Sequence, residues 1–143
     1  MARVASVNSG MLVEASDRWL LPLAGKAVRQ CCIDHAVNLR CEGEVEIRIE
    51  APLVFKGAEG VEQLLLPEGD PARLAPVLRV ARLVVVEASA FKDGHLELKF
   101  EGGTTITVAA AEDLEPWEIV GPGGLRIVSV PGGQLAVWRP IMP

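Results

Sequence analysis

Apolar and polar residues alternate along several stretches of the chain, as they do in β-strands with one face on a core and the other in water. The clearest case is residues 45–55, where every second residue is apolar and Glu46, Arg48 and Glu50 fall between. Similar runs occur at residues 37–41, 96–100 and 104–109, and a further strand is expected near residues 27–33. We expect one strand over 45–55 with Pro52 at a sheet edge or a bulge, since proline lacks the N–H that a sheet ladder needs.

Two of these stretches resemble each other. Residues 37–50 align with residues 96–109 without a gap, so that the Glu-Gly turn at Gly43 matches the one at Gly102. Each copy reads as strand, turn and strand. An internal duplication explains this likeness, and so does alternation alone, because any two amphipathic hairpins share half of their pattern.

The fold class that follows is mainly β, with a helical minority. Residues 27–55 and 80–109 are each expected to form a three-stranded antiparallel meander. One such sheet has a bare apolar face, so the two should pack as a sandwich or join into a partly open barrel.

One helix is expected, near residues 70–79. Asp70 is a suitable N-cap and Pro71 suits the first helical position, whereas Pro76 limits the helix to a few turns. The apolar residues expected to face inward are Leu74, Val77 and Leu78.

The C-terminal part of the chain is rich in short apolar runs separated by glycine turns. Its sequence from residue 117 to 138 reads WEIVGPGGLRIVSVPGGQLAVW. This segment resembles the end of an uncharacterised family of small bacterial domains with the pattern W-E-x-x-G-P-x-G followed by P-G-G-x-L-A-x-W. The resemblance extends over residues 23–138 and implies no activity.

The same segment supplies the candidate surface for a ligand or partner: Trp117, Glu118, Arg126 and Trp138. Tryptophan and arginine are common at interaction surfaces, and glycine turns can present backbone amides. The alternative, which we favour, has the tryptophans as core anchors and the glycines as turn residues with positive φ.

Composition limits the classes of function. The 143 residues suit one β-rich domain over residues 19–143, preceded by a loose tail over residues 1–18. The net charge of −5 argues against binding to nucleic acid and suits a basic partner. No apolar run is long enough to cross a membrane and no signal peptide begins the chain, so we expect a cytoplasmic location.

Few residues could support catalysis or bind a metal ion. His35 and His95 both lie beside expected turns, and no segment resembles a nucleophile elbow. Cys31 and Cys32 are adjacent, so on a strand they point to opposite faces and cannot easily bind one ion. We therefore expect no catalytic residue, no metal and no cofactor.

These observations favour a noncatalytic interaction module that binds a protein partner or itself. One version is an immunity-type protein that neutralises a basic toxin, and self-association would give a homodimer. The alternative is a small-ligand binder or a hydrolase with a pocket between the two β halves.

Overall fold

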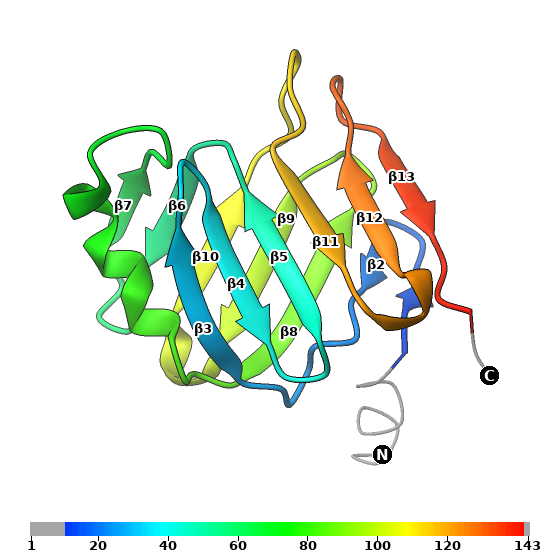
Figure 1. The fold of residues 1–143 in the computed structure, drawn as a ribbon, viewed down its shortest axis with the longest axis horizontal. Coiled ribbons are helices and arrows are strands. Elements are labelled where there is room, and N and C mark those ends of the chain that lie inside the picture. The colour runs from blue at the N-terminus through cyan, green and yellow to red at the C-terminus, as the bar shows by residue number, and fades with distance from the viewer. Residues whose placement is uncertain (1–10, 142–143) are drawn as a thin grey trace.

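The computed structural model describes residues 11–141 and consists of two antiparallel sheets that face each other (Figure 1). The seven-stranded sheet has, in spatial order, β1 (Val13–Glu14), β2 (Arg18–Leu20), β8 (Val85–Phe91), β9 (Leu96–Phe100), β10 (Thr105–Val108), β6 (Leu53–Lys56) and β7 (Glu62–Leu65). The six-stranded sheet has β13 (Leu135–Trp138), β12 (Arg126–Ser129), β11 (Trp117–Val120), β5 (Val45–Ile49), β4 (Val37–Cys41) and β3 (Val28–Ile33). The expected mainly β fold is confirmed, as a sandwich rather than a closed barrel.

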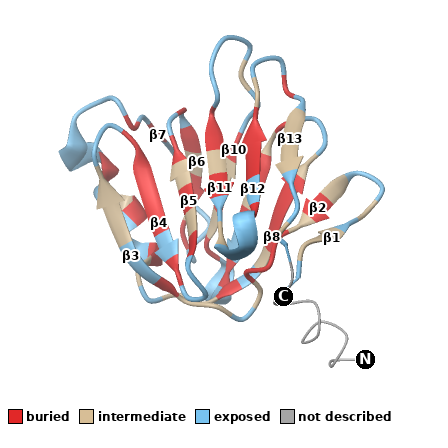
Figure 2. Cartoon of the chain, turned by 45° about the vertical axis from the view of Figure 1, so that its right-hand side comes forward, coloured by how far each residue is buried: buried red, intermediate tan, exposed pale blue. Residues whose placement is uncertain are grey.

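The core lies between the inner faces of the two sheets (Figure 2). Alternation decides which side chains reach it, since neighbouring residues on a strand point to opposite faces. On β5, for example, Val45, Ile47 and Ile49 are buried while Glu46 and Arg48 are partly exposed. A slip of one residue would place such a set in water, so burial of one face fixes the register of each strand.

The two expected meanders are present, as β3-β4-β5 and β8-β9-β10. Leu39 pairs with Ile47 in the first and Leu98 with Ile106 in the second. Both Glu-Gly turns use glycine at positive φ, 80° at Gly43 and 79° at Gly102. Both meanders also carry a register shift in their first strand, after Val28 and after Val85. Their common origin by duplication stays a prediction.

The expected strand over residues 45–55 is wrong, because the chain changes sheets in its middle. β5 ends at Ile49 and β6 begins at Leu53, where it pairs with β10 in the opposite sheet. Pro52 lies in the connection, where no ladder hydrogen bond is needed from it. Neither part is a sheet edge, since β5 lies between β4 and β11, and β6 between β10 and β7.

A similar crossing occurs after β10. Residues 109–116 carry the chain to the six-stranded sheet, where β11 pairs with β5. Each meander is therefore extended by two strands from outside it. β6 and β7 lie beside β10 in the seven-stranded sheet, and β11 and β12 lie beside β5 in the six-stranded sheet. The two halves of the chain are interlocked.

The expected helix is present as the 3₁₀ helix η1 (Pro71–Val80), and its Asp70 cap accepts a hydrogen bond from the Ala72 amide at 3.0 Å. Its buried residues are Leu74, Val77 and Val80. This spacing of three fits a 3₁₀ helix, which has three residues per turn, and it leaves Leu78 exposed, contrary to our expectation. η1 packs beside β3, at one edge of the six-stranded sheet. Two shorter 3₁₀ turns are η2 (Glu101–Gly103) and η3 (Pro122–Gly124).

The N-terminal boundary differs from the expected tail over residues 1–18. β1 and β2 form a hairpin that extends the seven-stranded sheet beside β8. Trp19 of β2 is buried and anchors this hairpin to the core. The rest of the expected tail, residues 1–10, lies outside the described residues.

Candidate functional site

Three of the four candidate surface residues, Glu118, Arg126 and Trp138, lie together on the outer face of the six-stranded sheet. The Arg126 Nε donates a hydrogen bond to the Glu118 carboxylate at 2.7 Å. The Arg126 guanidinium carbon also lies 5.4 Å from the centre of the Trp138 ring, within the range of a cation–π contact. Trp138 is 51% exposed on the edge strand β13, so this group is open to a partner.

Trp117 does not belong to this surface. It is 1% exposed and its Nε1 donates a hydrogen bond to the Gly94 carbonyl at 3.0 Å. The hydroxyl of Ser129 donates to the same carbonyl at 2.8 Å. Trp117 and Glu118 are consecutive on β11, so only one of them can face outward. The core-anchor interpretation of Trp117 is therefore the one that the structure supports.

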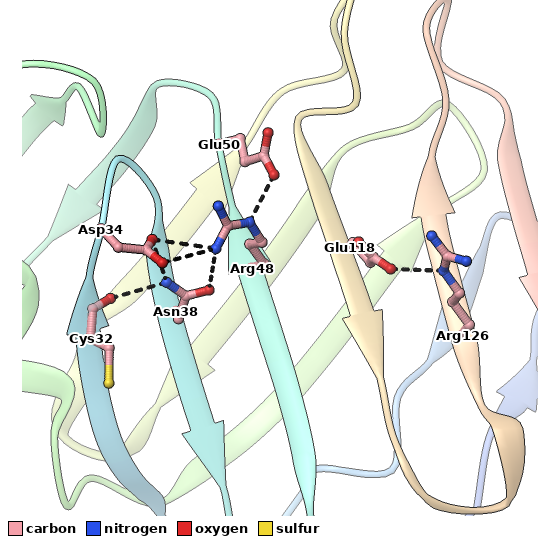
Figure 3. A network of polar contacts seen from close by, with 7 residues as sticks. All are labelled: Cys32, Asp34, Asn38, Arg48, Glu50, Glu118 and Arg126. Atoms are coloured by element: carbon pink, nitrogen blue, oxygen red, sulfur yellow. Dashed lines mark hydrogen bonds and ion pairs between the residues drawn. The ribbon is translucent and has the colours of Figure 1, made fainter.

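A polar network lies next to this group, on β4, β5 and the turn after β3 (Figure 3). Arg48 donates to Glu50 at 2.8 Å, to Asn38 at 3.0 Å and to Asp34 at 3.3 Å. The Asn38 amide also donates to Asp34 at 3.0 Å. The hydrogen bond from Asn38, and then the positive charge of Arg48, lower the pKa of Asp34. Arg48 is thus held in place by two carboxylates and an amide.

Between these groups lies a shallow hollow of about 190 Å³, lined by Asn38, Glu46, Arg48, Glu118 and Val120. Its charges are already compensated on the same face, since Arg48 is paired with Glu50 and Glu118 with Arg126. Pre-paired, partly exposed charges suit recognition by complementary polar groups, and they add little affinity by themselves.

The cysteines and histidines form no reactive centre within residues 11–141, where no cluster of three or more metal-ligating side chains occurs. Burial raises the pKa of the Cys41 thiol to about 11, and burial together with Cys32 does the same for Cys31. Both thiols are therefore protonated at neutral pH and weakly nucleophilic.

Among residues 11–141, one other group with side chains of catalytic type lies near the β8–β9 turn. The His95 Nδ1 lies 2.6 Å from the Asp93 carboxylate, and the His95 ring stacks on Phe91 with centroids 4.0 Å apart. Ser89, on the same strand as Phe91, is 1% exposed, and its hydroxyl has no partner among the described groups. A substrate cannot reach this buried hydroxyl.

One surface that the sequence does not reveal lies on and beside β6 and β7, the last two strands of the seven-stranded sheet. We call it the apolar corner, and its residues are Pro52, Val54, Leu64, Leu66 and Leu114. Val54 of β6 pairs with Leu64 of β7, and both point away from the core. Leu64 is 65% exposed and Leu66 is 51% exposed. Beside them is a mainly apolar hollow of about 390 Å³, lined by Pro52, Leu66, Pro67 and Leu114 and flanked by Glu50 and Glu68.

The segments that contain the apolar corner carry a net negative charge. These segments, residues 50–79 and 109–116, contain eight acidic and three basic residues. Their formal charge of −5 equals that of the whole chain, so acidic and basic residues balance everywhere else. This clustering can be read from the sequence. The exposed apolar surface of the corner cannot be read from the sequence, because the Leu64-Leu65-Leu66 run shows no alternation that would tell which leucines are exposed.

A second apolar hollow, of about 320 Å³, lies at the end of the sandwich where the β4–β5 and β11–β12 turns meet the segments that follow β2 and β13. Its walls include Pro22, Val45, Pro122 and Leu125. Lys26 is the one charged residue that lines it. Within the described part of the chain, none of the ion pairs includes Lys26.

Comparison with known proteins gives one match. The model of a family of unknown function, DUF6188, matches residues 19–139, which is most of the chain. No curated protein and no solved structure matches. In the described residues, no helix has the length and apolar character needed to cross a membrane.

Proposed function

We propose that this chain, which belongs to the family of unknown function DUF6188, is a noncatalytic interaction module that binds a basic protein partner, in the cytoplasm. The observation that carries the proposal is the apolar corner, where exposed leucines adjoin an apolar hollow inside an acidic border. Contiguous exposed apolar side chains rimmed by polar groups are typical of protein interaction sites.

Burial of apolar side chains would hold the partner in place, and the negative charge of the surrounding segments would favour a basic partner over others. Full burial of a leucine side chain contributes about 1.5–3 kcal/mol, so covering Leu64 and Leu66 would supply a central part of a binding free energy. The net negative charge of the surrounding segments would attract a basic partner and raise the association rate. Neutralisation of a basic toxin, as by an immunity-type protein, is one instance of such a function.

Self-association through this corner is less favourable than binding of a basic partner. Two copies would bring two segments of charge −5 together, and facing like charges lower the stability of a complex. A homodimer formed elsewhere, for instance through the exposed face at Glu118, Arg126 and Trp138, is compatible with the charge balance of that face.

Affinity capture from the source cells tests the proposal. The bait is the wild-type chain, and the test variant is Leu64→Ser with Leu66→Ser. The matched control is Val86→Ser, because Val86 is 58% exposed on β8 of the same sheet, outside the corner. We expect a stoichiometric partner to be retained by the wild type and by Val86→Ser, to be lost with the double variant, and to dissociate at high salt.

Two results would contradict the proposal. One is a partner that the double variant retains. The other is a monomer that captures no stoichiometric partner under low salt. A Trp138→Ala variant, tested alongside, would locate the partner on the outer face of the six-stranded sheet if it alone abolished capture.

The alternative function, a small-ligand binder, is supported by the hollow at Lys26. Its apolar walls and one lysine suit an amphipathic ligand with an anionic group near the Lys26 ammonium. Anilinonaphthalene sulfonate is a suitable fluorescent probe of this chemistry. If the hollow binds ligands of this class, Lys26→Met should weaken probe binding severalfold while Lys56→Met, a lysine on β6, should not. Equal binding by both variants would reject this alternative.

A further inference from the structure

After each crossing the chain adds two strands to the opposite sheet. The two sheets differ in whether a further strand pairs with the second of these added strands. In the six-stranded sheet, β11 and β12 follow β5, and β13 then pairs with the far side of β12. In the seven-stranded sheet, β6 and β7 follow β10, and among the described residues no strand pairs with the far side of β7. β7 thus has the position in its sheet that β12 has in the other sheet, but among the described residues no strand lies beside β7 as β13 lies beside β12.

The equivalence of the two strand pairs holds in detail. Phe55 pairs with Gln63 in β6–β7, and Ile119 pairs with Ile127 in β11–β12, at a constant separation of 64 residues. The turns also correspond, because the Gly57 amide donates to the Val61 carbonyl at 3.3 Å and the Gly121 amide to the Leu125 carbonyl at 3.0 Å. Glycine at positive φ closes both turns, 89° at Gly60 and 84° at Gly124.

This correspondence identifies the backbone groups at the open edge. Hydrogen-bonded and non-hydrogen-bonded pairs alternate along an antiparallel ladder. Since Val61 accepts a bond from Gly57, Gln63 and Leu65 also use their backbone groups toward β6. The amide and carbonyl groups of Glu62 and Leu64 therefore face away from β6. In β12 the equivalent residues are Arg126 and Val128, which pair with Trp138 and Ala136 of β13.

We propose that an extended segment of the partner adds to β7 as an antiparallel strand, in the position that β13 occupies beside β12. This inference rests on the proposed function and specifies how the partner binds. Strand addition supplies affinity through backbone hydrogen bonds, and alternate side chains supply specificity. On the outer face, the side chains next to the partner strand are Glu62 and Leu64, and Leu66 follows directly after the end of β7.

The partner segment has a defined pattern. Three of its residues lie opposite Leu66, Leu64 and Glu62, in that order along the segment, because the two strands are antiparallel. They are spaced at every second position, because alternate residues of a strand share a face. The first two are apolar, to cover leucines that are more than half exposed. The third is lysine or arginine, to face Glu62 inside the acidic border. A second copy of the chain does not match, since its own β7 would bring Glu62 and the same net negative charge.

A fluorescently labelled peptide of sequence Thr-Val-Thr-Val-Thr-Lys-Thr, acetylated and amidated, tests the pattern by anisotropy titration at low salt. The same peptide with Glu in place of Lys tests the charge. The decisive variants are Leu64→Pro and Leu64→Ala. Proline removes an amide that faces the open edge and leaves the bonds to β6 in place, whereas alanine removes the side chain and keeps the amide.

We expect saturable binding of the Lys peptide, with the dissociation constant about tenfold higher for Leu64→Pro than for Leu64→Ala. Glu62→Lys should reverse the preference between the Lys and Glu peptides, which keeps the test decisive if Leu64→Pro does not fold. Equal weakening by Leu64→Pro and Leu64→Ala would overturn strand addition and leave the apolar corner as a docking site. No binding to the wild type at millimolar peptide would also overturn strand addition, and the capture experiment would then decide the proposed function separately.

Discussion

Truncation of Ile47 and Ile106 tests whether the two meanders are equivalent in the core. Both side chains are buried at the centre of their sheets, Ile47 between Leu39 and Ile119, and Ile106 between Leu98 and Phe55. Replacing a buried isoleucine by alanine removes its transfer free energy and leaves a cavity, which together cost about 2–5 kcal/mol. Both neighbourhoods are made of large apolar side chains, so the two costs should agree within about 1 kcal/mol.

Urea unfolding of Ile47→Ala, Ile106→Ala and two surface controls measures these costs. The controls are Glu46→Ala and Thr105→Ala, which lie next to the isoleucines on the outer faces and should change the free energy of unfolding by about ±0.5 kcal/mol or less. Aspartate at either isoleucine should cost more than alanine, because it adds an unpaired charge to the core. If either alanine variant were as mild as its control, the inward assignment of that meander would be refuted.

Three further predictions concern the turns and the titratable groups. Gly94→Ala should destabilise the fold by about 2 kcal/mol more than Gly102→Ala in thermal unfolding. Both glycines have positive φ, but an added Cβ at Gly94 collides with the Gly133 carbonyl oxygen, whereas the equivalent space at Gly102 is open. The amide of His95 and then its side chain lower the pKa of Asp93 below its usual value of 3.8. The stability that Asp93 adds over Asp93→Asn should therefore be full at pH 7 and decrease as the pH falls below 3.8, which urea unfolding at pH 7 and pH 3 can show. Because the pKa of the Cys41 thiol is raised to about 11, iodoacetamide should label this thiol far more slowly at pH 7.5 than it labels a free cysteine. Mass spectrometry measures both labelling rates, and equal rates would contradict the burial of Cys41.

The sequence predicted the parts of the fold that depend on local alternation and turn chemistry. Val45, Ile47 and Ile49 repeat at the period of a strand, and the glycines at 43 and 102 adopt the positive φ that their turns need. Asp70 and Pro71 likewise marked the start of η1. Each of these signals acts over a few residues, so no knowledge of distant contacts was required.

The sequence could not predict features that depend on contacts between distant segments. The alternation of residues 45–55 continues through Pro52, and nothing local shows that β6 leaves for the opposite sheet. The exposure of Leu64 depends on β7 being the last strand of its sheet. Tryptophan suits both a core and an interface, so the sequence alone does not decide where Trp117 lies. Its hydrogen-bond partner, the Gly94 carbonyl, is 23 residues away in the chain.

The proposed binding mode is tested most directly by amide hydrogen exchange of β7 in the free chain and in the complex with the captured partner. We expect the amides of Glu62 and Leu64, which face the open edge, to become protected from exchange by about tenfold or more on binding. The amide of Gln63 faces β6 and should change much less. A partner that binds at unit stoichiometry and leaves the exchange of the Glu62 and Leu64 amides unchanged would contradict strand addition at β7.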